Sequence, residues 1–178
     1  MISIRTEGPA DVAAREALLD VAYGPIRFTK PSQRLRGRRE PALSLVALEH
    51  GRVVGTVRLW PVAAGGRPAL LLGPLAVHPD CRRRGVGAAL MRRALRAAAE
   101  AGHAVVLLVG DATYYGRFGF SAEKTGALAM PGPYEADRLL ALELAPGALD
   151  GAQGLIRIGA PRRAARRTVA VPAVAHAA

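Results

Sequence analysis

The sequence predicts an α/β protein in which strands and helices alternate, and three segments carry that prediction. Residues 69–77 and 104–109 are nearly unbroken apolar runs, which are typical of strands buried on both faces of a sheet. Between them, residues 85–101 have the apolar spacing of an amphipathic helix. With 178 residues, of which 51% are hydrophobic, the chain is long enough to bury a core as one domain.

The N-terminal segment is predicted to form a short strand and then a helix. Residues 2–5 have a strand-like pattern, and residues 9–22 have helical apolar spacing. The positions of this helix expected to face the core are Ala13, Ala17, Leu18 and Val21. Gly24 and Pro25 end the helix. The polar and basic residues 27–40 that follow have no readable pattern.

A hairpin is predicted next. Residues 43–49 and 52–62 each have strand character, and His50 and Gly51 between them form a tight-turn signal. The glycine-rich residues 63–68 are expected to turn the chain into the first buried strand.

The strongest helix of the chain is the one predicted at residues 85–101. Its core-facing positions recur every four residues: Val86, Leu90, Ala94 and Ala98. Gly102 ends it. Later, Asp111 is suited to cap a short helix that runs to Phe118, and residues 138–144 predict a late strand.

The charge is strongly basic and unevenly distributed. The formal net charge is +11 and only two of the 25 basic residues are lysines. Residues 151–178 contain five arginines and no acid. We therefore expect a folded domain at residues 1–146 and a basic, Ala/Arg-rich tail at 147–178 that is partly disordered. Nucleic acid, an anionic membrane surface and a polyanionic nucleotide are the partners that such a charge attracts.

Several classes of protein do not fit the sequence. No apolar run approaches the roughly 20 residues of a membrane-spanning helix, and the N-terminus lacks the pattern of a secretion signal. The single cysteine, Cys81, excludes an internal disulfide and a cysteine-based zinc site. We expect a cytoplasmic protein without a metal and without a membrane partner.

The segment after the first buried strand has the features of a phosphate-binding turn. The start of a helix leaves backbone N–H groups unpaired and carries a partial positive charge. Gly85 and Gly87 would let a phosphate approach the backbone closely. Arg82, Arg83 and Arg84 add positive charge just before the helix. These features together predict a pyrophosphate cradle.

Two common phosphate-binding motifs do not match this turn. A P-loop would require Lys and Ser or Thr where Ala88 and Ala89 stand. A dinucleotide-binding fingerprint would require a third glycine at Leu90, and its glycines should follow the strand directly, whereas residues 78–84 intervene here.

A third pattern matches. The sequence Arg-x-x-Gly-x-Gly at residues 82–87, after Leu-Ala-Val-x-Pro at residues 75–79, resembles the acetyl-CoA motif of the GNAT (general N-acetyltransferase) superfamily. Tyr115, followed four residues later by Gly119 and Phe120, resembles a second GNAT pattern. Both occur in the family's order, with the predicted helix and strand between them.

The resemblance covers roughly residues 1–146 and is greatest to the bacterial predicted-acetyltransferase branch. It implies the GNAT fold: a mixed, mostly antiparallel sheet with helices on both faces, whose fourth and fifth strands splay into a V-shaped cleft. It also implies an N-acetyltransferase with acetyl-CoA as co-substrate. The acetyl group would move to a primary amine of an unidentified small molecule or peptide, by direct attack in a ternary complex.

The resemblance also implies roles for individual residues. Backbone groups of the strand end would pair with the pantetheine arm, as an added strand does, and the amides of the turn would hold the pyrophosphate. The cofactor-binding set is Leu75, Ala76, Val77, Arg82, Arg83, Arg84, Gly85, Val86, Gly87, Ala88 and Phe118. Tyr115 would be the general acid that protonates the leaving thiolate. The alternative is that Tyr114 and Tyr115 only pack.

The general base and the acceptor site are less readable. Residues 69–77 contain no carboxylate, Asp111 is better suited to helix capping, and ordered water would serve equally well as a proton acceptor. Residues 23–40, 52–62 and 131–137 are expected to form the acceptor pocket. The candidate substrate-binding residues are Arg58, Trp60 and Tyr134. A basic pocket of this kind disfavours polycationic acceptors.

Two other classes of function remain open alternatives. One is a basic nucleic-acid-binding protein, although aromatic residues make up only 4% of the chain and no reader motif is present, so nucleic acid is disfavoured as a partner. The other is a non-catalytic acyl-CoA sensor with the same fold. An exposed edge strand at residues 138–144 would permit a homodimer.

Overall fold

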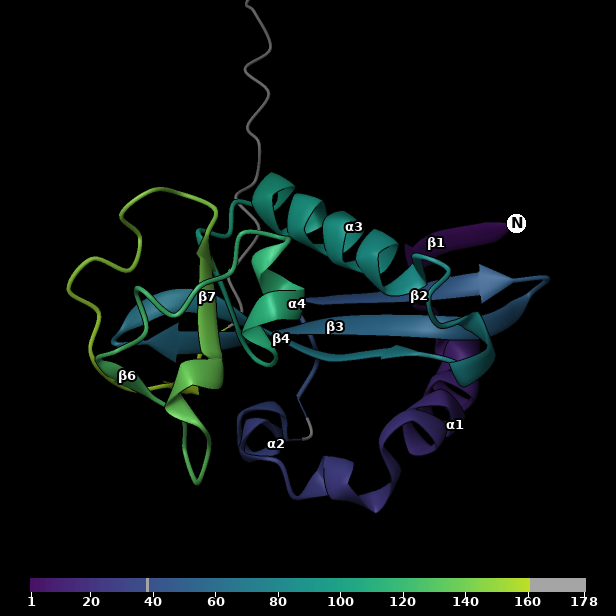
Figure 1. The fold of residues 1–178 in the computed structure, drawn as a ribbon, viewed down its shortest axis with the longest axis horizontal. Coiled ribbons are helices and arrows are strands. Elements are labelled where there is room, and N and C mark those ends of the chain that lie inside the picture. The colour runs from purple at the N-terminus through teal and green to yellow at the C-terminus, as the bar shows by residue number, and fades with distance from the viewer. Residues whose placement is uncertain (38, 161–178) are drawn as a thin grey trace, which may run out of the picture.

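The computed structural model describes residues 1–37 and 39–160, which form a seven-stranded sheet with helices on both faces (Figure 1). The strands of this sheet lie in the order β1 (Ile2–Thr6), β2 (Leu43–Glu49), β3 (Arg52–Ala64), β4 (Arg67–Val77), β5 (Val105–Val109) and β7 (Leu139–Glu143), with β9 (Arg157–Ile158) beside β3. A second, small sheet pairs β6 (Leu128–Ala129) with β8 (Gly154–Leu155). Short 3-10 turns lie at Pro9–Asp11, Gly24–Phe28, Pro79–Cys81 and Ala136–Arg138.

Neighbouring strands of the large sheet are antiparallel, except that β4 and β5 are parallel. The mixed, mostly antiparallel sheet that the resemblance implies is therefore confirmed. The hairpin of β2 and β3 turns at His50 and Gly51, which have φ angles of 49° and 78°. Two successive left-handed residues give a turn whose twist matches that of the strands.

Helix α3 (Val86–Glu100) packs on one face of the sheet, over β2, β3 and β4. The four positions predicted to face the core, Val86, Leu90, Ala94 and Ala98, are all buried. The packing is close, because a Cβ placed on Gly55 of β3 would lie 2.9 Å from a methyl group of Leu90. This close contact fixes α3, and with it the glycine turn at its start, against the sheet.

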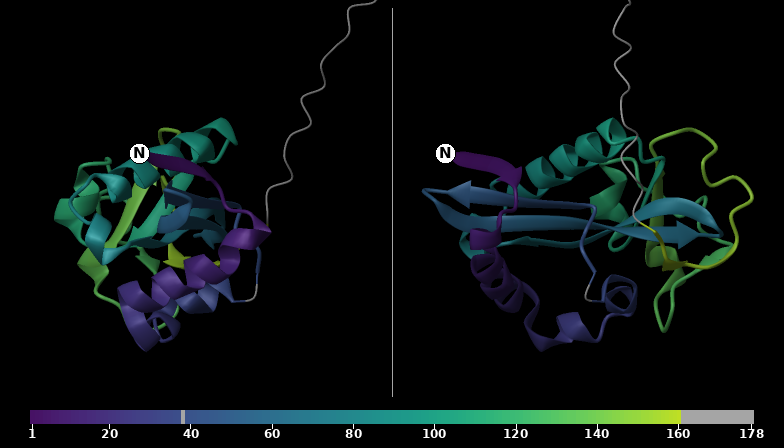
Figure 2. Two further views of the ribbon diagram at one scale, coloured as in Figure 1. Left: turned by 90° about the vertical axis from the view of Figure 1, so that its right-hand side faces the viewer. Right: turned by 180° about the vertical axis from the view of Figure 1, so that it is seen from behind.

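Helices α1 (Val12–Tyr23) and α2 (Pro31–Arg36) cover the opposite face, as the views from two sides show (Figure 2). The prediction for the buried side of α1 is wrong except at Leu18. Arg15 and Leu19 are buried, whereas Val21 is 59% exposed. The reason is an ion pair inside the fold, because the Arg15 Nε donates to Glu7 Oε1 at 3.1 Å. A count of apolar positions misses a helix face that contains a paired arginine.

The parallel strands β4 and β5 pair only at two positions, Leu70 with Val106 and Leu71 with Leu107. Just beyond them, Gly73 and Pro74 form a bulge opposite the single residue Arg58 of β3. A bulge bends the strand that contains it, and here β4 leaves β5 from this point on. The V-shaped opening between the fourth and fifth strands is therefore confirmed.

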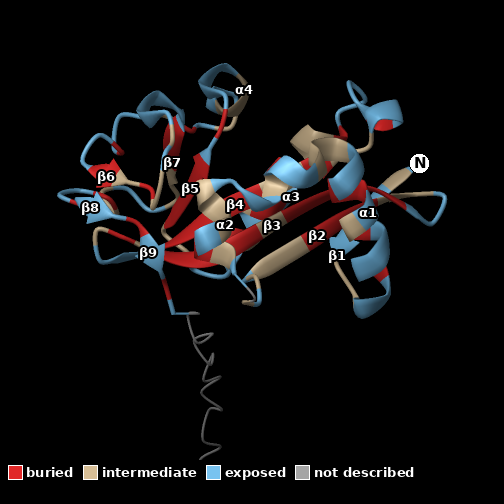
Figure 3. Ribbon diagram, turned by 90° about the horizontal axis from the view of Figure 1, so that it is seen from below, coloured by how far each residue is buried: buried red, intermediate tan, exposed pale blue. Residues whose placement is uncertain are grey.

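Residues 147–160 belong to the folded domain, so the boundary predicted at residue 146 is too early. Leu149, Ala152 and Ile156 are buried in a core cluster beneath β3 and β5, and Ile158 pairs with Val62. Buried residues predominate along the central strands (Figure 3), and Leu149, Ala152 and Ile156 add buried positions in this mostly exposed segment. These few apolar residues give no recognisable pattern, because alanine and glycine dominate the segment around them. Residues 161–178, and with them most of the predicted tail, lie outside the described residues.

The outer edge of the large sheet is β7, as the late-strand prediction required. This edge is not free along its whole length, because Ser121 and Ala141 exchange two backbone hydrogen bonds of 3.0 and 2.8 Å there. The expected homodimer edge is thus already paired at Ala141. Within residues 1–37 and 39–160, no helix is both long and apolar enough to cross a membrane.

Candidate active site

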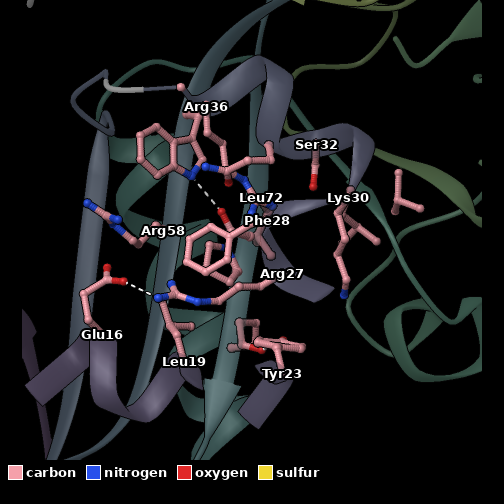
Figure 4. A pocket seen from close by; sticks show the side chains of 18 of the residues that line it. Glu16, Leu19, Tyr23, Arg27, Phe28, Lys30, Ser32, Arg36, Arg58 and Leu72 are labelled. Atoms are coloured by element: carbon pink, nitrogen blue, oxygen red, sulfur yellow. Dashed lines mark hydrogen bonds and ion pairs between the residues drawn. The ribbon is translucent and has the colours of Figure 1, made fainter. Parts of the chain in front are cut away.

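A pocket of about 310 Å³ lies where β4 and β5 separate, on the side of the sheet that α1 and α2 cover (Figure 4). Elements far apart in the sequence meet in its wall. Tyr23 comes from the end of α1, Arg36 from α2, Arg58 from β3 and Tyr115 from the short helix α4 (Ala112–Gly116). The pocket therefore joins the opening in the sheet to a wall of side chains that bear charge.

Tyr115 is held at this opening by the cap of α4. The Asp111 Oδ1 accepts a hydrogen bond of 2.6 Å from the Tyr114 N–H, as the capping prediction required. The Tyr115 ring lies over Gly110, where an added Cβ would be only 2.3 Å from the ring. Burial raises the pKa of Tyr115 well above its usual range. Its hydroxyl is therefore protonated at neutral pH and available as a donor.

A second tyrosine reaches the same opening. The Tyr23 hydroxyl donates to the backbone carbonyl of Leu75 on β4, and burial raises the pKa of Tyr23 as well. The sequence placed Tyr23 only at the start of the range 23–40 expected to form the acceptor pocket, because nothing in the chain links position 23 to position 75. Its one signal is its place as the last residue of a helix before Gly24.

At the end of β4, every second residue directs its backbone N–H and C=O groups toward the opening. The His78 N–H donates to Val54 on β3, and the Leu75 carbonyl faces the other way, toward Tyr23. Because the N–H and C=O of one residue point to the same side of a strand, Leu75 and Val77 direct both groups into the opening, and Ala76 directs its groups to β3.

The glycine turn before α3 has the geometry of a cradle. Gly85 caps the helix with φ 78°, and an added Cβ there would meet nothing within 4 Å. The first helical bond runs from the Ala89 N–H to the Gly85 carbonyl, so the amides of Val86, Gly87 and Ala88 have no partner inside the helix. A Cβ on Gly87 would lie 3.1 Å from the Tyr114 hydroxyl. Open space at Gly85 and unpaired amides thus coincide here, and the binding of a pyrophosphate at this turn stays a prediction.

The three arginines before the turn differ from one another. Arg84 forms a two-point ion pair with Glu49, at 2.5 and 3.1 Å, and this hydrogen bonding lowers the pKa of Glu49 to about 2. Glu49, the last residue of β2, is thereby a structural partner of Arg84. Arg82 and Arg83 are exposed and have no ion pair with a described residue. Of the predicted arginine cluster, these two present unpaired charge.

Two of the three predicted acceptor residues line the pocket. The Arg58 guanidinium lies 4.7 Å from the centre of the Trp60 ring, and the Trp60 indole donates to the Gly73 carbonyl at 2.7 Å. Tyr134 does not line it. Its hydroxyl donates to the Leu128 carbonyl at 3.2 Å and its ring packs on the core beneath β3 and β5, which leaves it structural. The expected contribution of residues 131–137 is therefore not found.

Comparisons with known proteins agree with this arrangement. Residues 40–122 match the model of the acetyltransferase (GNAT) domain. The uncharacterised N-acetyltransferase YhbS of Escherichia coli K12 is 33% identical over 156 residues, which are 86% of this chain and 93% of YhbS. The chain belongs to the GNAT acetyltransferase family. Both the family and the enzyme class predicted from the sequence are confirmed.

Solved GNAT structures have the same fold. The crystal structure of Escherichia coli YhbS in complex with CoA has a TM-score of 0.78 and 31% identity, and covers 88% of this chain and 89% of that one. A GNAT acetyltransferase of Brucella melitensis in complex with acetyl-CoA has a TM-score of 0.68 and 30% identity, and covers 90% and 97%.

Proposed function

We propose that this GNAT enzyme is acetyl-CoA-dependent and transfers the acetyl group to a primary amine by direct attack in a ternary complex. The observation that carries the proposal is the opening between β4 and β5, which has a glycine cradle beyond one end and a protonated tyrosine beside it. The CoA and acetyl-CoA complexes of the two relatives support it.

The residues present fit acetyl-CoA. The backbone groups of Leu75 and Val77 face the opening and suit the amides of the pantetheine arm, as an extra strand would. Unpaired amides at the start of α3, with Arg82 and Arg83 beside them, suit the pyrophosphate. Bound there, acetyl-CoA would supply an activated thioester at the opening.

The chain's own groups then serve the transfer. A C–N bond forms and the C–S bond breaks, so the acceptor nitrogen loses one proton and the sulfur gains one. Tyr115 is the proton donor to the sulfur, and solvent returns the proton to Tyr115. An amide of Leu75 or Val77 is placed to stabilise negative charge on the carbonyl oxygen. Phe118, beside the Tyr114 ring at 5.7 Å, would border the cofactor.

Deprotonation of the acceptor needs no carboxylate in this pocket. Glu16 is the carboxylate in the wall, and its Oε2 is already paired with Arg27 at 2.6 Å. The pocket wall has four cations against one carboxylate, and like charge lowers the pKa of an ammonium group. The neutral amine that attacks the thioester therefore forms by loss of a proton to water.

The test is calorimetric titration with acetyl-CoA and with CoA, on the native chain and two glycine variants. Gly87→Glu places a bulky anion where a Cβ already lies 3.1 Å from the Tyr114 hydroxyl. We expect micromolar binding in the native chain and its loss in Gly87→Glu. The matched control is Gly126→Glu, at an exposed glycine with open space around it.

If Gly87→Glu binds acetyl-CoA as tightly as the native chain does, the cofactor does not bind at the cradle. Native binding without CoA release for any amine would favour an acyl-CoA sensor instead of an enzyme. Thermal unfolding of each variant shows whether the fold is kept.

A further inference from the structure

The acceptor half of the pocket is rich in cations that the described residues only partly neutralise. Its wall contains Arg27, Lys30, Arg36 and Arg58 against the single carboxylate of Glu16. The close view shows these basic side chains around one hollow (Figure 4). A site built for a polyamine would have the opposite balance.

The four cations differ in how they are paired. Arg27 is neutralised by Glu16 and Asp20, at 2.6 and 2.9 Å. Arg58 has only a distant contact, 3.9 Å from its Nε to Glu7 Oε2, and Glu7 is already bonded to Arg15. Arg36 has no ion pair with any residue between 1 and 160 that the structure describes. Lys30 likewise has no ion pair with a described residue, but it is exposed and lies over the Tyr23 ring at 4.6 Å. Arg36 is thus the main uncompensated charge that is not exposed.

Arg36 is also fixed in place. A Cβ on Gly73 would lie 2.7 Å from its terminal guanidinium nitrogen, so the side chain rests against the β4 bulge at the opening. Its Nε is buried and has no hydrogen-bond partner, and the same holds for the Nε of Arg58. Burial lowers the pKa of Arg36 to about 10. A buried guanidinium nitrogen without a hydrogen-bond partner is rare in proteins, because it loses hydration without replacement.

A bound anion would balance the unpaired charge of Arg36 through the terminal nitrogens of its guanidinium group. A carboxylate or a phosphate accepts two parallel hydrogen bonds from the guanidinium fork, which a neutral group cannot do. The Arg58 guanidinium, stacked on Trp60 at 4.7 Å, faces the same pocket and adds to the field. The volume of about 310 Å³ suits a molecule the size of an amino acid or a small phosphoamine.

Resting on the proposed N-acetyltransferase function, we propose that the acceptor is a small amine that also bears an anionic group, and that Arg36, assisted by Arg58, binds this group. Anchoring the anion at the bulge leaves the amine end of the molecule to reach the opening beside Tyr115. The same contact selects against acceptors that are only cationic.

The experiment measures binding to the CoA-loaded protein, in which no acetyl group can be transferred. Two matched pairs of amines are titrated by calorimetry: β-alanine with β-alaninamide, and O-phosphoethanolamine with ethanolamine. We expect the anionic member of at least one pair to bind roughly 30-fold or more tightly than its neutral partner. The two pairs distinguish a carboxylate from a phosphate as the preferred group.

Variants assign the preference to Arg36. Arg36→Gln should abolish the difference within the pair, and Arg36→Lys should keep only part of it, because an ammonium group lacks the fork. Arg34→Gln, on the same helix but exposed and outside the pocket wall, should keep the full difference. CoA affinity, measured in every variant, shows that fold and cofactor site are intact.

Equal binding within both pairs, no binding of any of the four amines, or an unchanged preference in Arg36→Gln would overturn the inference. Failure of the proposed function looks different. An anion preference that Arg36→Gln removes, together with no release of CoA from acetyl-CoA for any amine, would leave the anion site and refute the transferase.

Discussion

The two sides of the opening between β4 and β5 are constructed in different ways. The proposed cofactor side presents backbone groups of contiguous residues, from Leu75 on β4 to Ala88 at the start of α3. The proposed acceptor side is lined by side chains from α1, α2, β3 and α4, such as Tyr23, Arg36 and Trp60. A backbone site tolerates many side chains but few changes at its glycines. In a site made of side chains, each substitution changes which ligand is preferred.

This difference suits an enzyme with one constant and one variable substrate. In the proposed function, the nucleotide end of acetyl-CoA would be recognised through amides and helix-end charge, which every sequence with the right turn supplies. The acceptor would be recognised by charge and shape, which here depend on a few arginines. We therefore expect substitutions on the two sides to separate cofactor binding from acceptor selection.

The largest effect beyond the cradle itself is expected at Tyr115, where the two sides meet. Tyr115→Phe removes the proposed proton donor to the leaving sulfur but keeps the ring that packs on Tyr114 and Phe120. We expect kcat to fall about 100-fold with acetyl-CoA affinity unchanged. Thiol release measures kcat, and calorimetry measures the affinity. Tyr134→Phe, whose hydroxyl bonds Leu128 outside the pocket, is the control.

A Tyr115→Phe enzyme with native kcat would assign the donor elsewhere, and Tyr23 would then be the next residue to test. Equal losses in the Tyr115 and Tyr134 variants would instead indicate a general loss of packing.

The same difference between contiguous backbone sites and assembled side-chain sites decides what the sequence predicts. The cradle, the α3 face and the Asp111 cap are contiguous patterns, so they could be predicted position by position. The pocket wall could be predicted only in part. The ranges 23–40 and 52–62 contribute to it as expected, but only the fold brings Tyr23 to Leu75 and Arg36 to Gly73. Tyr134 shows the converse error. It has the right residue type in an expected loop, yet its hydroxyl is satisfied by Leu128.

Two further misses have a common cause. On α1 the buried Arg15 is paired with Glu7, and in residues 147–160 a few apolar anchors are diluted by alanine and glycine. In both segments the tertiary partner decides burial, and the local pattern does not reveal the partner.

A smaller effect is expected at Tyr23, which contacts the cofactor strand from the acceptor side. Tyr23→Phe removes the hydrogen bond to the Leu75 carbonyl. One such bond is worth about 1 kcal/mol, so we expect kcat/KM for acetyl-CoA to fall about 5-fold. A rise in KM alone would mean that the bond shapes the pantetheine groove. A fall in kcat alone would place the Tyr23 hydroxyl in the chemical step.

The pH profile tests the state of Tyr115 with an effect of about 2-fold. Since burial raises its pKa above the ordinary value of 10.0, Tyr115 remains a donor at pH 10, where an exposed tyrosine would be half ionised. We expect kcat to stay level up to pH 10 with a saturating acceptor. If the hydroxyl were solvated, kcat at pH 10 would be half of its value at neutral pH. This fall would be absent in Tyr115→Phe.

The smallest effect is expected at the edge of the cofactor side, where Glu49 holds Arg84. The Glu49 pKa is lowered from 4.5 to about 2 in the folded chain, so its contribution to stability is present above pH 4.5 and is lost as the pH falls to 2. The pair is partly exposed, and solvent screening keeps the contribution small. Glu49→Gln should therefore lower the melting temperature slightly at pH 6, and the difference from the native chain should vanish near pH 2. Glu123→Gln, at an exposed carboxyl group without an ion pair to a described residue, should show no such pH-dependent difference.

A difference in melting temperature between Glu49→Gln and the native chain that persists at pH 2 would mean that Glu49 stabilises the turn by packing rather than by charge. In that case the backbone cradle would depend on a side chain after all.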